Sequence, residues 1–142
     1  MKIINTVNNR ARMLIVGVFT MLFAGVLYAW SILNVPLAEE LGYSKSTLSL
    51  NFTLTMCFFC LGGLVSSFLV KRFGTKPIIF FAGLIAGEGF ALTSILNSET
   101  SFLLYVTYAL LSGLGIGIAY IIIISTVNAW FPDKRGFSSG AL

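Results

Sequence analysis

The chain has 142 residues, of which 57% are hydrophobic and only 10% are charged, and its formal net charge is +4 at pH 7. Soluble domains usually contain about 25% charged residues, so this chain has too few to cover a surface that faces water. The composition therefore excludes a soluble enzyme, a secreted disulfide-bonded scaffold and a disordered tail, and it indicates an integral membrane protein.

Four apolar stretches are long enough to cross a membrane, because a spanning helix needs about 20 apolar residues. The predicted segments are a leader at 1–12, spans at 13–34, 47–70, 77–96 and 102–130, and the start of a fifth span at 136–142. We expect Pro36 to end the first helix and Pro77 to lie in the first turn of the third. The sequence thus predicts an all-α integral membrane fold with four transmembrane helices plus the start of a fifth.

The distribution of basic residues predicts the orientation. Eight of the nine lysines and arginines lie in the leader, between the second and third spans, or after the fourth span, and only Lys45 lies on the opposite side. Because cytoplasmic loops are enriched in Lys and Arg, we expect a multi-pass protein of the cell (plasma) membrane with a cytoplasmic N-terminus. The basic residues do not form a groove-shaped face with interleaved aromatic residues, which argues against nucleic-acid binding.

The residue inventory argues against metal, cofactor and enzyme chemistry. There is no histidine, so imidazole metal sites and histidine-dependent nucleophiles are excluded. Cys57 and Cys60 have C-x-x-C spacing, but they lie in an apolar span without a second pair, which favours packing over redox or metal chemistry. We therefore expect no cofactor, no metal site and no enzymatic activity.

Polar side chains form a stripe on three of the spans when 100° is taken per residue. The stripes contain Tyr28 and Ser31 on the first span, Asn51, Thr55 and Ser66 on the second, and Tyr105, Tyr108 and Tyr120 on the fourth. Trp30 falls on the opposite side of the first span. Because polar side chains are costly in lipid, we expect each stripe to turn toward another helix or a watery cavity. Interhelical hydrogen bonding and a substrate path both fit this pattern.

Glu88 lies near the middle of the third span, where a carboxylate is a candidate functional group by default. It is interpreted either as a coupling acid that carries a proton or as a hydrogen-bonded packing residue. Small residues recur at four-residue spacing and predict close contacts between helices. These pairs are Gly25 and Ala29, Gly63 and Ser67, Gly83 and Gly87, and Gly113 and Gly117.

The segment between the second and third spans resembles a loop signature of the major facilitator superfamily, G-x-x-x-D-R-x-G-R-R/K. Arg72, Gly74 and Lys76 match this signature. Ser67 stands where glycine is usual, and Lys71 stands where aspartate is usual.

Further motifs resemble the oxalate/formate antiporter family of that superfamily. They include Tyr28-Ala29-Trp30-Ser31, Tyr105-x-x-Tyr108, and Trp130-Phe131-Pro132-Asp133-Lys134-Arg135-Gly136. The resemblance covers nearly the whole chain. It implies a transporter of small carboxylates that works by alternating access between two six-helix halves, with the lipid bilayer and a small organic anion as partners.

The resemblance also implies roles for individual residues. The first and fourth helices would line the substrate cavity with Tyr28, Ser31, Tyr105, Tyr108 and Tyr120. The cytoplasmic gating loop would comprise Arg72, Gly74, Lys76, Asp133 and Arg135. Within this gate, Arg72 would pair with Asp133.

Such transporters have about twelve spans in two halves, so the resemblance implies that this chain is an N-terminal part that lacks the C-terminal helices and is inactive alone. The four spans contain no Lys or Arg to hold a carboxylate dianion. Two alternatives stay open. One is a stand-alone, four-span, proton-coupled exporter that works as a dimer through Glu88. The other is a membrane interaction subunit without a transport role, which the glycine faces suggest.

Overall fold

The computed structural model describes residues 2–97 and 100–142, with side chains described from residue 9 onward. Within these residues the fold is helical, with short connections. The elements are α1 (Lys2–Ala24), η1 (Gly25–Ala29), α2 (Trp30–Glu40), α3 (Lys45–Phe73), α4 (Thr75–Thr93), α5 (Ser101–Leu104), η2 (Tyr105–Ser112), α6 (Gly113–Trp130), η3 (Pro132–Lys134) and α7 (Arg135–Ala141).

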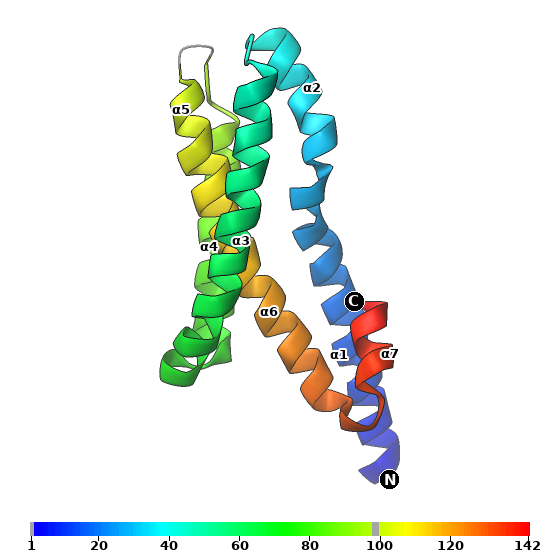
Figure 1. The fold of residues 1–142 in the computed structure, drawn as a ribbon. Coiled ribbons are helices and arrows are strands. Elements are labelled where there is room, and N and C mark those ends of the chain that lie inside the picture. Colours follow the sequence, from blue (N-terminus) through cyan, green and yellow to red (C-terminus); the bar gives the residue numbers. More distant parts are fainter. Residues whose placement is uncertain (1, 98–99) are drawn as a thin grey trace.

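Four helical segments of the described residues are long and apolar enough to cross a membrane, which confirms the predicted fold class. They are Asn9–Glu40, Lys45–Phe73, Thr75–Thr93 and Ser101–Trp130, referred to below as spans 1 to 4. Figure 1 shows α3, α4 and α5 grouped together, while α6 runs obliquely from this group to α1 and α7 lies against α1. Span 4 is therefore the element that joins the other three.

The first helix does not end before Pro36, so that prediction is wrong. Pro36 lies inside α2, which continues to Glu40. A proline removes one main-chain hydrogen bond and kinks a helix more readily than it ends one when packing favours continuation. Here Leu37 and Leu41 pack against the hydrophobic core beyond the proline. The chain then turns at Gly42, whose φ of 67° lies in the left-handed region that favours glycine.

Capping and turn residues explain the bounds of the next two helices. The Ser44 hydroxyl accepts a hydrogen bond from the Thr47 N–H at 3.1 Å and caps the start of α3. Gly74 alone connects α3 to α4, with a φ of 84° that a side chain would strain. Pro77 lies in the first turn of α4, as predicted.

Glycines of α6 allow it to pack directly against the main chains of α3 and α4. A Cβ atom at Gly117 would collide with the Phe59 carbonyl group of α3, and one at Gly115 would lie 2.7 Å from the Ala82 carbonyl oxygen of α4. Gly113 faces α3 in the same way, so the predicted contact of Gly113 and Gly117 is confirmed. The pair Gly83 and Gly87 instead faces open space among the described residues, because the other side of α4 packs on α6.

The polar stripe of α3 turns inward, as predicted, and buries Asn51, Thr55 and Ser66. On span 1 the arrangement is the reverse of the expectation. Trp30 is only 5% exposed and joins the core, whereas Tyr28 is 59% exposed. The 3₁₀ geometry of η1, which precedes Trp30, changes the angle per residue and so shifts the face presented by span 1.

Candidate functional site

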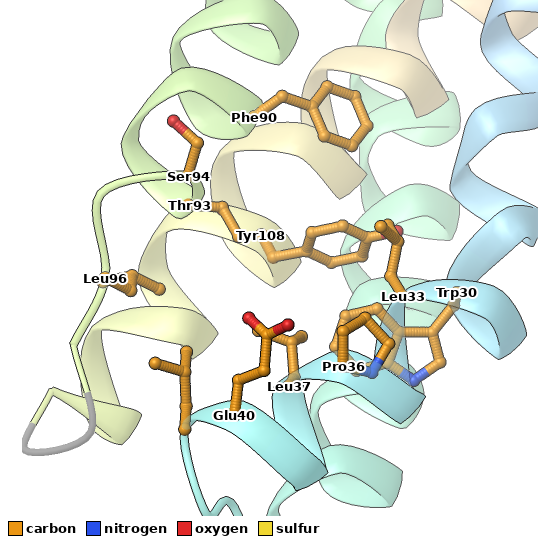
Figure 2. A pocket seen from close by; sticks show the side chains of 11 residues that line it. Trp30, Leu33, Pro36, Leu37, Glu40, Phe90, Thr93, Ser94, Leu96 and Tyr108 are labelled. Carbon is orange, nitrogen blue, oxygen red and sulfur yellow. The ribbon is translucent and has the colours of Figure 1, made fainter.

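A cleft of about 380 Å³ opens between α2, the end of α4 and η2, and is called the Glu40 cleft here. Its walls include Trp30, Leu37, Glu40, Phe90, Thr93 and Tyr108. Figure 2 shows the Glu40 carboxylate pointing from α2 into this space on the side of Tyr108. The cleft therefore combines one acidic group with walls that are largely apolar.

Three aromatic rings from different elements form the deep wall of the Glu40 cleft. The Tyr108 ring centroid lies 4.6 Å from that of Trp30 and 5.6 Å from that of Phe90, in tilted and edge-on arrangements that favour aromatic pairs. Tyr108 is 1% exposed, and its hydroxyl donates a 3.4 Å hydrogen bond to the Leu27 carbonyl oxygen. These contacts hold the three rings in place.

The hydroxyl groups beside this wall are already engaged within the chain. The Thr93 hydroxyl bonds to the Gly89 carbonyl oxygen at 2.7 Å and to the Thr107 hydroxyl at 3.0 Å. The Ser94 hydroxyl donates to the Ala91 carbonyl oxygen at 2.7 Å. Glu40 is the one ionic side chain among the described residues that line the cleft, and it makes no ion pair with any of them. The field in this cleft therefore opposes a carboxylate ligand.

A second cleft, of about 490 Å³, opens at the other end of α4, between α3, α4 and α6, and is called the Lys71 cleft here. Lys71 lines it together with the side chains of Ser66, Ser67, Thr75, Ser125, Thr126 and Trp130. The Ser66 hydroxyl donates to the Gly63 carbonyl oxygen at 2.6 Å. An ammonium group and several hydroxyl groups that line one cleft are chemically suited to hydrogen-bond a carboxylate, because charge-assisted hydrogen bonds are stronger than neutral ones.

The two departures from the loop signature meet in the Lys71 cleft. Ser67 replaces the usual glycine and Lys71 replaces the usual aspartate, and both line this cleft four residues apart on α3. The sequence pattern does not predict that Ser67 and Lys71 line one cleft with Thr75 and Ser125. Their i, i+4 spacing was the signal that would have found them.

The predicted cavity residues do not share one face among the described helices. Tyr108 lines the Glu40 cleft, but Tyr105 contacts Phe102 at 6.2 Å between ring centroids and Tyr120 contacts Phe59 at 5.3 Å. The wide π-helical turns of η2 change the angle per residue, so the stripe calculated for a regular helix is not kept along span 4. On span 1, Tyr28 and Ser31 are both exposed.

The gating-loop residues also differ from the expectation. Asp133 pairs with Arg10 of α1, at 3.9 Å between charged atoms, so the expected pairing of Arg72 with Asp133 is wrong. The reason is that α6 leans toward α1 and carries η3 to the α1 side (Figure 1). The Arg72 guanidinium instead lies 5.5 Å from the ring centroid of Phe73. Arg135 and Lys76 are exposed.

Glu88 lies on the exposed face of α4 and forms no hydrogen bond among the described residues. Gly83 and Gly87, whose Cβ positions meet open space, are exposed as well. Glu88 therefore does not act as a hydrogen-bonded packing residue within the described part of the chain.

Comparisons with known proteins agree with this architecture. A model of the Major Facilitator Superfamily matches residues 9–142. The oxalate:formate antiporter of Oxalobacter formigenes is 33% identical over 133 residues, which cover 93% of this chain and 31% of that relative. An uncharacterized MFS-type transporter of Escherichia coli (strain K12), YhjX, is 30% identical over 89% of this chain and 31% of its own length. Monocarboxylate transporter 9 of Mus musculus is 26% identical over 90% of this chain and 25% of its own length. The chain thus spans less than a third of the length of these relatives.

Proposed function

Because the chain belongs to the major facilitator superfamily, we propose that it is the N-terminal part of a transporter of small carboxylates that works by alternating access. The names of two relatives, an oxalate:formate antiporter and a monocarboxylate transporter, support the substrate class. Their greater length supports the view that further helices complete the transporter. Alone, this chain would not carry out exchange.

The chemistry of the Lys71 cleft is the main support for a carboxylate substrate. An uncompensated ammonium group attracts an anion, and neighbouring hydroxyls supply the additional donors that a carboxylate requires. The positive-inside rule supports a cytoplasmic N-terminus in the plasma membrane, which would open the Lys71 cleft to the cytoplasm. A carboxylate would then bind there before entering, or after leaving, the central cavity.

The exposed polar residues of span 1 support the proposal that further helices cover this side. Tyr28 and Ser31 are exposed beside apolar residues of the same span, and an exposed polar face in lipid is costly. In the complete transporter, these two residues would face the substrate cavity, together with the tyrosines of span 4. Arg72, Gly74 and Lys76 would then gate the cytoplasmic side with Asp133 and Arg135, and the Arg10–Asp133 pair would be part of this gate.

The two tryptophans of the chain give a direct test, because Trp130 lines the Lys71 cleft and Trp30 lines the Glu40 cleft. The chain would be labelled with 5-fluorotryptophan, placed in lipid nanodiscs and titrated with formate and oxalate while its two ¹⁹F signals are recorded. We expect saturable movement of the Trp130 signal only, and at least a tenfold loss of affinity in Lys71→Gln. Lys76→Gln is the matched control, because Lys76 is not among the residues that line this cleft.

Two outcomes would contradict this proposal. An equal loss in Lys76→Gln would mean that general surface charge, not the cleft, attracts the anion. Saturable carboxylate exchange by the chain alone in proteoliposomes would overturn its proposed status as an inactive part.

A second candidate function rests on the exposed face of α4. Gly83 and Gly87 would allow another helix to approach closely beside Glu88, which fits a proton-coupled, four-span exporter that works as a dimer. This candidate predicts that Glu88→Gln abolishes proton-coupled efflux while insertion is kept. If a different protein covers this face and no efflux occurs, the chain is a membrane interaction subunit instead.

A further inference from the structure

The Glu40 cleft is poorly suited to hold a carboxylate, because the one ionic group among its described lining residues is itself a carboxylate. It is nevertheless of the size at which proteins bind small molecules: about 380 Å³, compared with roughly 300–1,000 Å³ for typical ligand sites. Its walls come from α2, α4 and η2, so the helix packing itself shapes it.

The apolar lining of this cleft favours apolar groups, and the buried rings of Trp30 and Tyr108 form a rigid support behind it together with Phe90. They contact one another at centroid distances of 4.6 Å and 5.6 Å, so the wall exists before any ligand arrives. A preformed wall costs little entropy on binding.

The charge of the cleft selects the sign of the ligand. Glu40 points into the cleft (Figure 2), and no lysine or arginine among the described residues lines it. The nearest basic residue in sequence, Lys45, lines a different cleft with Glu39, on another face of α2. Two adjacent glutamates thus face two different environments, and the carboxylate of Glu40 has no cation of the described chain as a partner.

We propose that the Glu40 cleft binds an organic cation, a protonated amine or quaternary ammonium group that carries an apolar body. The ammonium group lies at the Glu40 carboxylate, and the apolar body packs against Leu33 and Phe90, which line the cleft beside the buried rings of Trp30 and Tyr108. Both a free amine and the headgroup of a choline lipid have this chemistry, and the choice of bilayer distinguishes them.

The test uses the same ¹⁹F-labelled chain, in nanodiscs of phosphatidylglycerol, which contains no amine. The probe is benzyltrimethylammonium, and its uncharged isostere, neopentylbenzene, is the control ligand. We expect benzyltrimethylammonium to move the Trp30 signal saturably without moving that of Trp130, and neopentylbenzene to bind at least tenfold more weakly.

Two neighbouring variants separate a specific site from surface charge. Glu40→Gln should weaken binding at least tenfold, while Glu39→Gln, at a matched position that faces the other cleft, should change it less than twofold. An equal loss in both variants, equal binding of neopentylbenzene, or no saturable movement of the Trp30 signal would overturn the proposal.

A last comparison repeats the titration in nanodiscs of phosphatidylcholine, to distinguish a free amine from the choline headgroup as the ligand. If the free amine is the ligand, the affinity for benzyltrimethylammonium should be the same in both lipids. If the choline headgroup occupies the cleft, the apparent affinity of the wild-type chain and of Glu39→Gln should be lower in phosphatidylcholine than in phosphatidylglycerol, because the headgroup competes. Glu40→Gln should bind equally weakly in both lipids. Either result supports an ammonium site at Glu40.

Discussion

The Glu40 cleft and the Lys71 cleft lie at opposite ends of α4 and have similar volumes, about 380 and 490 Å³. Both are bounded by apolar helices, and both have walls from α4 and from span 4. They differ in one ionic side chain each and in their hydroxyl groups, which are engaged within the chain near Glu40 and mostly without a recorded partner near Lys71. If both clefts bind the ligands proposed above, a single ionic residue sets the ligand class of each one in a membrane domain with so few charges.

The largest effect should come from a change that removes both clefts together. Gly117→Leu places a side chain where the main chain of Phe59 lies, so α6 must move away from α3. We expect a destabilisation of about 3 kcal/mol, as for severe overpacking, and the loss of both ¹⁹F responses. Unfolding in a denaturing detergent, followed by far-UV circular dichroism, measures this change.

Gly83→Leu is the matched control, because the Cβ position of Gly83 has no neighbour within 4 Å. It should leave both the stability and the two ligand responses unchanged. A similar loss of stability in the two variants would show that a leucine in any glycine position is disruptive, and that the close contact of α6 with α3 is not special.

Exchanging the two charges should exchange the ligands. In the double variant Glu40→Lys with Lys71→Glu, we expect each cleft to lose affinity for its original ligand by about 100-fold, since reversal replaces an attraction by a repulsion of similar size. Formate should then move the Trp30 signal. Benzyltrimethylammonium should bind at Lys71→Glu only weakly, because the wall of rings is absent there.

The ¹⁹F titrations of the two single variants are the control for this exchange. Each single reversal should affect only its own cleft, because the clefts share no lining residue. If Lys71→Glu alone weakened ammonium binding at Trp30, the two sites would be coupled through the bundle and the comparison of independent clefts would fail.

Regular helices explain what the sequence alone could predict. The inward stripe of α3 is correct because this element keeps regular α-helical geometry over 29 residues, so 100° per residue holds along it. Spans 1 and 4 contain η1 and η2, where the number of residues per turn changes, and Trp30, which is expected on the outer side of span 1, is buried instead. No local pattern distinguishes these irregular turns from ordinary helix.

Long-range contacts explain most of the remaining differences. The pairing of Asp133 with Arg10 depends on the direction in which α6 leans, which follows from glycine contacts with α3 and α4. Likewise, Ser67 and Lys71 line a cleft only because α6 brings Ser125 to the same place. Sequence spacing indicates which residues share a helix face, but not which other helix that face meets.

Removing single hydroxyl groups from the Lys71 cleft should lower its affinity for formate by a smaller factor than reversing its charge. Ser67→Ala and Ser125→Ala each remove one hydroxyl of the Lys71 cleft. We expect each to weaken formate binding about three- to tenfold, somewhat less than the roughly 1.5–3 kcal/mol net value of a hydrogen bond to a charged group, because the cleft is open. The Trp130 ¹⁹F titration measures both. Ser94→Ala, at the Glu40 cleft, should leave formate binding unchanged.

The smallest effect is expected at the Tyr108 hydroxyl. Its bond to the Leu27 carbonyl oxygen is long, at 3.4 Å, and hydrogen bonds between membrane helices average about 0.6 kcal/mol. Tyr108→Phe keeps the ring against Trp30 and Phe90, so ammonium binding at Trp30 should change less than threefold. Tyr120→Phe, outside both clefts, gives the baseline for removing a phenol from span 4. A loss of tenfold or more in Tyr108→Phe alone would mean that the hydroxyl itself contacts the ligand, and the Glu40 cleft would then resemble the Lys71 cleft in using a donor as well as a charge.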